Sequence, residues 1–237
     1  MGENMLLRSK DRKVANSVTK SGNPNIANSF GLPAGKEYSC PEQTAFCSNI
    51  CYAGKLEKIY KGVRNNLIAN WEALHTAEFA EQYNLLDSMI TEFEAECDRK
   101  NADKLFRIHW DGDFFSNEYT RAWAAVIDNH PDTHFWVYTR VLASAMVLNM
   151  LKLPNLALYF SADENNLHFA NIAKDKGINI AFVGNTFAEG KELFPKATKC
   201  PENNKALPLI SEKGSACKVC GLCINGRKDV LFSTSKK

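Results

Sequence analysis

Three cysteines lie close together in the first quarter of the chain, at Cys40, Cys47 and Cys51. Cysteine thiolates are the usual protein ligands of iron–sulfur clusters and of structural zinc ions. Three thiolates can hold a metal centre while one coordination position stays open to a second molecule. We therefore interpret the segment from Cys40 to Tyr52 as the active loop of an iron–sulfur enzyme. A small zinc knuckle or a set of buried free thiols would use the same residues.

A second group of cysteines lies near the end of the chain and consists of Cys200, Cys217, Cys220 and Cys223. The last three form two successive C-x-x-C steps, a spacing that recurs in ferredoxin-type [4Fe–4S] binding. Four-cysteine zinc sites usually have two separated C-x-x-C pairs, so we favour a cluster and keep zinc at these cysteines as the alternative. With four protein ligands the site is closed, which indicates a structural or electron-transfer role and no substrate chemistry.

The expected compartment favours metal binding over disulfides for most of the eight cysteines. No apolar run approaches the ~20 residues of a transmembrane helix, and the first residues lack the apolar core of a secretion signal. We therefore expect a cytoplasmic protein, in which structural disulfides are uncommon. Cys97 is an exception, because it lies on the apolar stripe of a predicted helix and is expected to be a buried structural thiol.

The overall composition is that of an ordinary globular protein. The chain has 237 residues, of which 45% are hydrophobic and 24% charged, and this length allows one large domain or two small ones. Its net charge of +2 is too small to attract the whole protein to nucleic acid or to an anionic membrane. Charge therefore gives no indication of a nucleic-acid partner, because phosphate binding needs clustered Lys and Arg.

Strands and helices alternate from residue 105 onward, which predicts parallel βαβ units. The predicted strands are Leu105–Trp110, His134–Arg140, Leu156–Ala162 and Ile178–Gly184. Helices are predicted between them at Asn117–Asn129, Leu142–Leu151 and Leu167–Asp175. Apolar residues at helical spacing predict two longer helices earlier in the chain, Leu56–Leu74 and Phe79–Cys97. A short strand leading into the cysteine loop is predicted at Lys36–Ser39.

Each predicted strand has one apolar face and one more polar face, because adjacent residues of a strand point to opposite sides. In a doubly wound sheet both faces should be apolar, so this pattern favours a (β/α) barrel or partial barrel whose interior holds a ligand. A half-solvated antiparallel sheet is the alternative, and the intervening helices argue against it. We expect three regions: an extended N-terminal arm (1–36), a partial α/β barrel with the cluster loop (37–195) and a C-terminal cysteine-rich segment (196–237).

Polar residues at the ends of the predicted strands are candidates for ligand contact. The turn Asp111-Gly112-Asp113 follows the first strand, and its glycine permits close backbone approach while its carboxylates accept hydrogen bonds. The next two strands end near Tyr138, Arg140, Ser161 and Asp163. Arg140 could pair with a ligand carboxylate, and Ser161 or Asp163 could bind hydroxyl groups. The alternative is an ion pair inside the barrel, for example Arg140 with Asp163 or with an aspartate of the turn. His109 is expected to occupy space in the barrel interior as a hydrogen-bonded side chain and not to act as a ligand.

The order of a three-cysteine loop, a helix and a strand ending in a glycine–acid turn resembles the radical S-adenosylmethionine (SAM) superfamily. The resemblance implies that Cys40, Cys47 and Cys51 bind a [4Fe–4S] cluster whose fourth iron is chelated by SAM. It implies that the turn at Asp111 contacts the SAM amino group. Other aromatic and polar side chains would contact the rest of the cofactor: Tyr52, Tyr138, Arg140, Ser161 and Asp163. The C-terminal cysteines resemble the auxiliary clusters of many members. The spacing here is C-x6-C-x3-C, where that superfamily has C-x3-C-x2-C.

Short motifs spread over nearly the whole chain resemble the bacteriophage "gene product 88" family. They are Phe30–Gly35, Cys40–Pro41, Cys51–Ala53, His109–Phe114, Phe135–Arg140 and Cys220–Cys223. This resemblance implies expression in the cytoplasm of an infected bacterium, and it implies no particular reaction.

The leading hypothesis is a phage-encoded iron–sulfur protein with one or two [4Fe–4S] clusters and a radical-SAM-type oxidoreductase or transferase reaction at the open one. The resemblance then implies SAM as a cofactor and an electron donor such as a flavodoxin or ferredoxin as a partner. The unusual cysteine spacing favours a second hypothesis, a non-catalytic iron–sulfur module for redox sensing or partner binding. A zinc-stabilised nucleic-acid-processing factor is the third, and none of the three involves a membrane.

Overall fold

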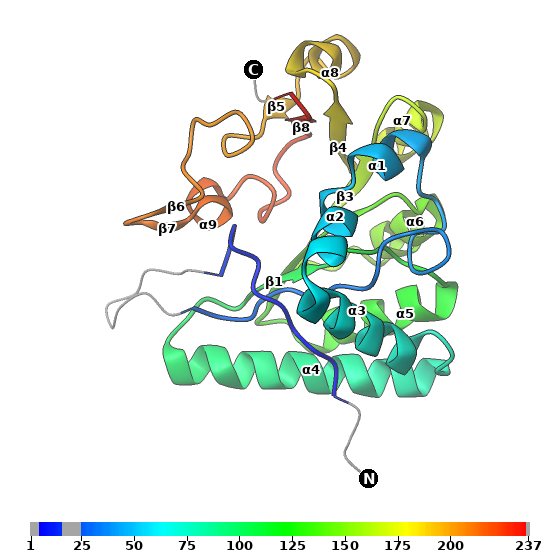
Figure 1. Ribbon diagram of the computed structural model, residues 1–237, viewed down its shortest axis with the longest axis vertical. Coiled ribbons are helices and arrows are strands. Elements are labelled where there is room, and N and C mark those ends of the chain that lie inside the picture. The colour runs from blue at the N-terminus through cyan, green and yellow to red at the C-terminus, as the bar shows by residue number, and fades with distance from the viewer. Residues whose placement is uncertain (1–4, 16–24, 236–237) are drawn as a thin grey trace.

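The computed structural model describes residues 5–15 and 25–235 (Figure 1). Its helices are α1 (Ala45–Ile50), α2 (Tyr52–Ile59), α3 (Lys61–Leu74), α4 (Phe79–Lys100), α5 (Asn117–Asn129), α6 (Leu142–Leu151), α7 (Leu167–Asp175), α8 (Phe187–Leu193) and α9 (Ala216–Cys220). Its strands are β1 (Leu105–Ile108), β2 (His134–Thr139), β3 (Leu156–Ala162), β4 (Asn179–Gly184), β5 (Thr198–Lys199), β6 (Ile210–Ser211), β7 (Gly214–Ser215) and β8 (Val230–Ser233). The strand–helix alternation predicted from residue 105 onward is confirmed.

One six-stranded sheet organises the molecule, in the order β1-β2-β3-β4-β8-β5, and each neighbouring pair in it is parallel. A separate antiparallel pair is formed by β6 and β7. The first four strands lie side by side in chain order, and α5, α6 and α7 connect them. Connections between parallel strands are right-handed, and here each one leads to the next strand along the sheet. The three connecting helices therefore lie on the same face of the sheet. That face is the apolar one.

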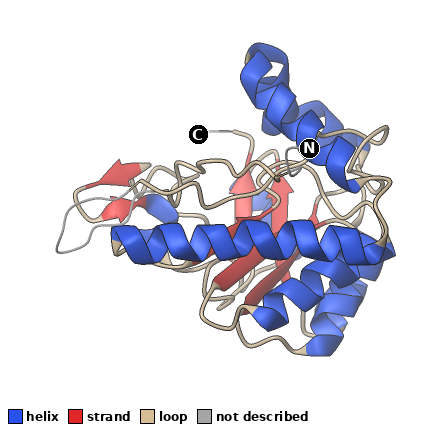
Figure 2. Cartoon of the chain, turned by 90° about the horizontal axis from the view of Figure 1, so that it is seen from below, coloured by secondary structure: helices blue, strands red, loops and turns tan. Residues whose placement is uncertain are grey.

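Apolar side chains on this face pack against the helices. Phe106 of β1 is fully buried and contacts Phe93 of α4 edge to face, with ring centroids 5.0 Å apart. Trp123 of α5 is also fully buried and lies 6.3 Å from the Phe106 ring. Figure 2 shows the long helix α4 crossing in front of the strands. Full burial of a large apolar side chain stabilises the fold by about 1.5–3 kcal/mol, so this layer holds the helices to the sheet.

The predicted α/β class is confirmed, with a parallel main sheet. Among the described strands β1 and β5 form its edges, and closure into a barrel of the radical-SAM kind stays a prediction. The sheet also contains β5 and β8, which the sequence pattern did not predict. Both come from the C-terminal segment, which therefore supplies part of the same sheet.

The N-terminal arm adds an extended segment beside β1. Ser29 forms a parallel bridge with Arg107, and the Phe30 N–H donates to the Arg107 carbonyl at 3.1 Å. Phe30 and Leu32 are completely buried and belong to the core on the helical side of the sheet. Ile26, Phe30 and Leu32 thus complete the core on this side of the sheet, while the N-terminal arm as a region of its own stays a prediction.

Two local predictions are wrong. Lys36–Ser39 is a turn and not a strand. Gly35 has a φ of 118°, and its carbonyl accepts a hydrogen bond from the Cys40 N–H at 3.0 Å, which reverses the chain before the cysteine loop. The predicted helix Leu56–Leu74 is broken at Tyr60, whose extended backbone separates α2 from α3. The cysteine loop thus follows a turn and contains α1.

Candidate functional site

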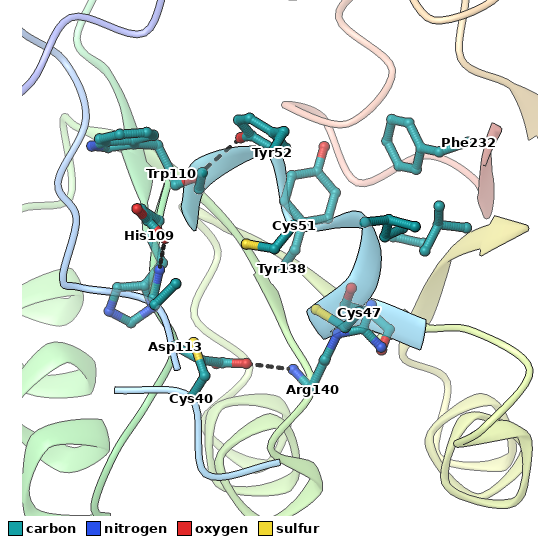
Figure 3. A pocket seen from close by; sticks show the side chains of 18 of the residues that line it. Cys40, Cys47, Cys51, Tyr52, His109, Trp110, Asp113, Tyr138, Arg140 and Phe232 are labelled. Carbon is teal, nitrogen blue, oxygen red and sulfur yellow. Dashed lines mark hydrogen bonds between the residues drawn. The ribbon is translucent and has the colours of Figure 1, made fainter. Parts of the chain in front are cut away.

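A cavity of about 670 Å³ lies on the polar face of the sheet (Figure 3). Small-molecule and cofactor sites have volumes of this size. Eight residues of five neighbouring strands line it: Arg107, Trp136, Tyr138, Ser161, Ala181, Val183, Phe232 and Ser233. Residues of α1 and α2 form one wall, and the C-terminal cysteine segment contributes another. The predicted polar face is present in part, because Arg107 and Ser161 lie on it beside apolar side chains such as Trp136 and Val183.

Six of the seven cysteines predicted as metal ligands line this one cavity: Cys40, Cys47, Cys51, Cys200, Cys217 and Cys223. All are free thiols. Cys220 does not line the cavity, but its thiol lies close enough to Cys223 to help raise the pKa of that residue. Cys97 is fully buried in α4, as predicted. The second cysteine group was expected to be a closed site, yet it faces the same space as the first.

Helices α1 and α2 position the first group through their caps. The Thr44 hydroxyl accepts a hydrogen bond from the Cys47 N–H at 3.0 Å and donates to Asp163 Oδ2 at 2.6 Å. Cys51 joins the two helices, and its Sγ accepts a hydrogen bond from the Gly54 N–H at 3.3 Å. Thr44 therefore ties the cysteine loop to the residue that follows β3.

Arg140 is engaged within the protein. Its Nη1 donates to Asp163 Oδ2 at 2.6 Å, and Asp163 is completely buried outside the cavity lining. Burial raises the pKa of the Cys47 thiol, and the charge and hydrogen bond of Arg140 oppose this rise. The sequence allowed two roles for Arg140, namely ligand binding or an ion pair with Asp163. The structure has the ion pair.

Asp113 fastens the turn after β1 to the end of β2. Its Oδ1 accepts a hydrogen bond from the Thr139 hydroxyl at 2.6 Å, and its Oδ2 accepts one from the Arg140 N–H at 2.8 Å (Figure 3). Burial raises the pKa of Asp113 to about 6. The three hydrogen bonds that its carboxylate accepts oppose this rise. Since both carboxyl oxygens already have partners, Asp113 holds the turn in place.

Asp111, by contrast, has a carboxyl oxygen without a donor at the cavity wall. The residue is 4% exposed, its Oδ1 accepts from the Gly112 N–H at 2.9 Å, and no donor among the described residues reaches its Oδ2. Burial and the neighbouring Glu57 carboxyl raise the pKa of Asp111 to about 8. Glu57 is buried in α2, and no sequence pattern marks it. Buried polar atoms usually have partners, so Asp111 Oδ2 is a candidate ligand contact.

The backbone of this turn is unusual at two positions. His109 has a φ of 57°, a left-handed conformation that residues with a side chain rarely adopt. Gly112 has a φ of 80°, and a Cβ there would lie 2.4 Å from Ser39 Oγ and 2.9 Å from Leu32. His109 Nε2 is hydrogen-bonded to the Tyr119 hydroxyl at 2.9 Å, as expected. Burial lowers the pKa of His109 to about 3, so its ring is neutral.

The second cysteine group is held by the N-terminal arm and lies beside side chains of β1 and β2. The Cys217 N–H donates to the Lys13 carbonyl at 2.9 Å, and Arg107 Nη1 donates to Asp11 Oδ2 at 2.5 Å. The guanidinium of Arg107 lies over the Tyr138 ring at 5.6 Å, and Tyr138 lies close enough to Cys223 for the thiol to help raise the pKa of the tyrosine. Burial raises the pKa of Cys223 to about 11.

Asp11, Lys13 and Arg107 all line the cavity, although no chemistry was predicted for them. The arm that carries the first two lacks any periodic pattern, and Arg107 is a single charged residue in an otherwise apolar strand. Only the pairing of the arm with β1 and with the C-terminal segment brings them to the site.

The other predicted contact residues also lie at the cavity. Ser161 lines it, while its carbonyl accepts hydrogen bonds from Asn166 Nδ2 at 3.1 Å and Arg140 Nη1 at 3.4 Å. Tyr52 lies at the opening, 56% exposed, and its hydroxyl donates to the Trp110 carbonyl at 3.1 Å.

The thiols are gathered but do not converge on one point. Within residues 5–15 and 25–235, no three His, Cys, Asp or Glu side chains are grouped as they would be around a single metal ion. The same part of the chain has no helix long and apolar enough to cross a membrane. The predicted metal ligands and cofactors therefore stay predictions.

The fold and the cavity define an α/β protein with a cysteine-lined site at its parallel sheet. The family model "Gene product 88" matches residues 4–226, and the chain belongs to this family. It is 58% identical over 236 residues to the Gene 88 protein of Mycobacterium phage L5, which covers 98% of this chain and 99% of the relative. The Gene 88 protein of Mycobacterium phage D29 is 57% identical over 237 residues, with the same coverage. No solved structure matches this chain. The predicted phage family is thereby confirmed, and the radical-SAM resemblance stays a prediction.

Proposed function

We propose that this phage protein is an iron–sulfur protein of radical-SAM-like organisation. Cys40, Cys47 and Cys51 would hold one [4Fe–4S] cluster with an open position, and the four C-terminal cysteines would hold a second cluster. The proposal is carried by one observation: two cysteine groups far apart in the sequence line the same cavity. A cluster in this cavity would supply one-electron chemistry, and SAM bound at its open iron would turn it toward radical reactions.

The chemistry of the donor set fits a cluster. A single tetrahedral zinc ion holds its sulfur ligands about 3.8 Å apart, from Zn–S bonds of about 2.3 Å. In a four-iron cluster each thiolate binds a different iron, so the cysteine sulfurs are farther apart than they are around one zinc ion. Thiols that line one cavity without converging on one point suit such a cluster. Each cysteine group also has an arginine beside it, buried or largely buried. Arg140 lies at Cys47, and Arg107 lies near Cys217 and Cys223. Buried cations stabilise the negative charge of thiolate-bound iron.

Residues of this chain would orient a ligand at the open side of the first cluster. Asp111 Oδ2 has no donor among the described residues, and it would accept a hydrogen bond from an amino or hydroxyl group of that ligand once the carboxyl is ionised, above its pKa of about 8. Tyr52 stands at the opening and would cover the bound molecule.

A second candidate function is the non-catalytic iron–sulfur module. The observation that favours it is the engagement of the polar groups that would otherwise recognise SAM. Arg140 pairs with Asp163, and both oxygens of Asp113 accept hydrogen bonds from the end of β2. Because these groups are already bonded to one another, they would not be needed to bind SAM, and the cysteines could still hold clusters.

Iron and sulfide analysis of anaerobically purified protein tests the proposal. We expect about eight iron and eight sulfide per chain for two cubane clusters, with a brown colour from charge-transfer absorption. Cys51→Ala and Cys217→Ala should each leave about four iron. Cys97→Ala is the matched control and should keep both clusters, because Cys97 lies in the α4 core. Colourless protein with stoichiometric zinc would overturn the cluster assignment.

SAM then separates the two candidate functions. If the first cluster is open, adding SAM to the dithionite-reduced protein should change the cluster's electron paramagnetic resonance spectrum and release 5′-deoxyadenosine. Intact clusters with an unchanged spectrum and no release would instead assign the non-catalytic module.

A further inference from the structure

Helix α2 and the start of α3 carry a concentration of positive charge beside the cavity. Four basic residues fall within ten positions: Lys55, Lys58, Lys61 and Arg64. Glu57 is the acidic residue of this stretch, and it is 4% exposed, so its charge is withdrawn from the surface. The three lysines form no ion pair with any described residue, while Arg64 contacts Glu57 at 3.4 Å and stays 46% exposed.

Large apolar side chains are exposed on the same helices. Tyr52 and Tyr60 are each 56% exposed, and Ile59 is 67% exposed. Apolar groups that gather at the surface usually mark a binding site, because burying them against a partner removes them from water. We call these three residues, with the four basic ones, the basic face.

The basic face is continuous with the cavity. Tyr52 and Lys55 line the cavity and are also exposed at its opening. Figure 1 shows α1, α2 and α3 following one another along one side of the molecule, so a partner lying along α2 would reach the opening.

We propose that the basic face binds single-stranded nucleic acid, with the strand passing the opening of the cavity. Unpaired lysines at this spacing suit a row of phosphates, and exposed tyrosine rings suit stacking with unpaired bases. An acidic protein would match the charge but would not by itself require exposed aromatic rings. The proposal goes beyond the proposed function, and binding at this face does not depend on a cluster.

Fluorescence anisotropy with the full chain tests it, using labelled oligothymidylate and oligouridylate of about 20 nucleotides. Four phosphate contacts predict that affinity falls about 50-fold between about 50 and about 200 mM KCl. The K55A/K58A/K61A variant keeps one cation of the face, so its affinity should fall only about threefold over the same range. It should also bind at least about tenfold more weakly at the lower salt. The two probes separate a DNA from an RNA preference.

Tyr60 tests the stacking contribution separately from charge. Tyr60→Ala should weaken binding by about five- to one-hundredfold, whereas Tyr60→Phe should bind like the unchanged protein because it keeps the ring. Circular dichroism melts of every variant check that the fold is kept.

The control variant is K176A/K196A/K213A, which removes three exposed lysines outside the basic face and should bind within about twofold of the unchanged protein. The proposal is wrong if neither probe binds saturably at low salt, or if this control weakens binding as much as the α2–α3 variant. Displacement of the bound probe by poly-glutamate at equal charge concentration would assign the face to an acidic protein and would also overturn the proposal.

Discussion

At the scale of single residues, the cavity contains polar groups that hold the loops and polar groups left for a ligand. Asp113 and Arg140 use their side chains within the protein. Asp111 keeps an oxygen without a donor although it is buried as deeply. Asp111 and Asp113 are two positions apart in the sequence and both are carboxylic acids, so only their hydrogen bonds distinguish a structural from a ligand-binding role.

Gly112 is required for the turn that carries both aspartates. Gly112→Ala should lower the free energy of unfolding by about 3 kcal/mol or more, because a left-handed alanine costs about 1–2 kcal/mol and its Cβ would also clash. Gly177→Ala is the matched control, since Gly177 has a φ of 78° with nothing within 4 Å of an added Cβ. Urea unfolding should therefore show a larger loss for G112A, and equal losses would remove the close approach as its cause.

At the scale of elements, short helices with defined caps position the first cysteine group. Thr44 and Cys51 cap α1 and α2, and Thr44 connects α1 to the residue after β3. A six-residue helix with no buried residue has little stability of its own. The cap bonds therefore determine where Cys47 stands relative to the cavity.

Removing the Thr44 cap should loosen the cysteine loop. Thr44→Ala should lower stability by about 1–2 kcal/mol and speed the alkylation of Cys47 in metal-free protein. Ser116→Ala is the control, because Ser116 caps α5 through the Tyr119 N–H at 3.1 Å and lies in another part of the fold. Peptide mapping by mass spectrometry measures the alkylation of Cys47. Equal alkylation in the two variants would contradict the assigned role of Thr44.

At the scale of the whole molecule, segments from both ends of the chain meet across the cavity. Residues 11–15 contact the segment that carries Cys217, and the Ser215 hydroxyl donates to the Arg12 carbonyl at 2.9 Å. The largely buried pair of Arg107 and Asp11 joins this junction to β1. These segments, which form walls of the cavity, therefore come together only when the sheet is complete.

The pair of Arg107 and Asp11 should contribute more to stability than its surface counterpart. The two side chains are 15% and 10% exposed, and Asp11→Asn would leave a largely buried guanidinium without its counter-charge, which costs about 3 kcal/mol. Glu202→Gln breaks the pair with Lys13, whose side chains are 39% and 23% exposed, and it should cost at most about 1 kcal/mol. Chemical unfolding of both variants checks the difference, and similar losses would show that burial does not strengthen the pair.

Much of the central fold could be predicted because it depends on local periodicity. The bounds of α5, α6, α7 and β3 match the predictions, since a helix stripe and strand alternation are each set by backbone geometry. The two-residue strand β5 and the late strand β8 carry too little pattern, and their place in the sheet comes from pairing with distant residues. The break at Tyr60 interrupts an apolar stripe that continues on both sides of it.

The sequence by itself determined which donors this protein has: seven thiols in two groups, and strands with one polar face. Those properties depend on residue type and on alternation between neighbouring residues, and both are local. The tertiary structure decided that the two groups line one cavity, because only the order of the strands places the C-terminal segment opposite α1 and α2. It also decided that Glu57 is buried beside Asp111 while the lysines around it stay exposed, because helix packing selects which side of α2 faces the cavity wall.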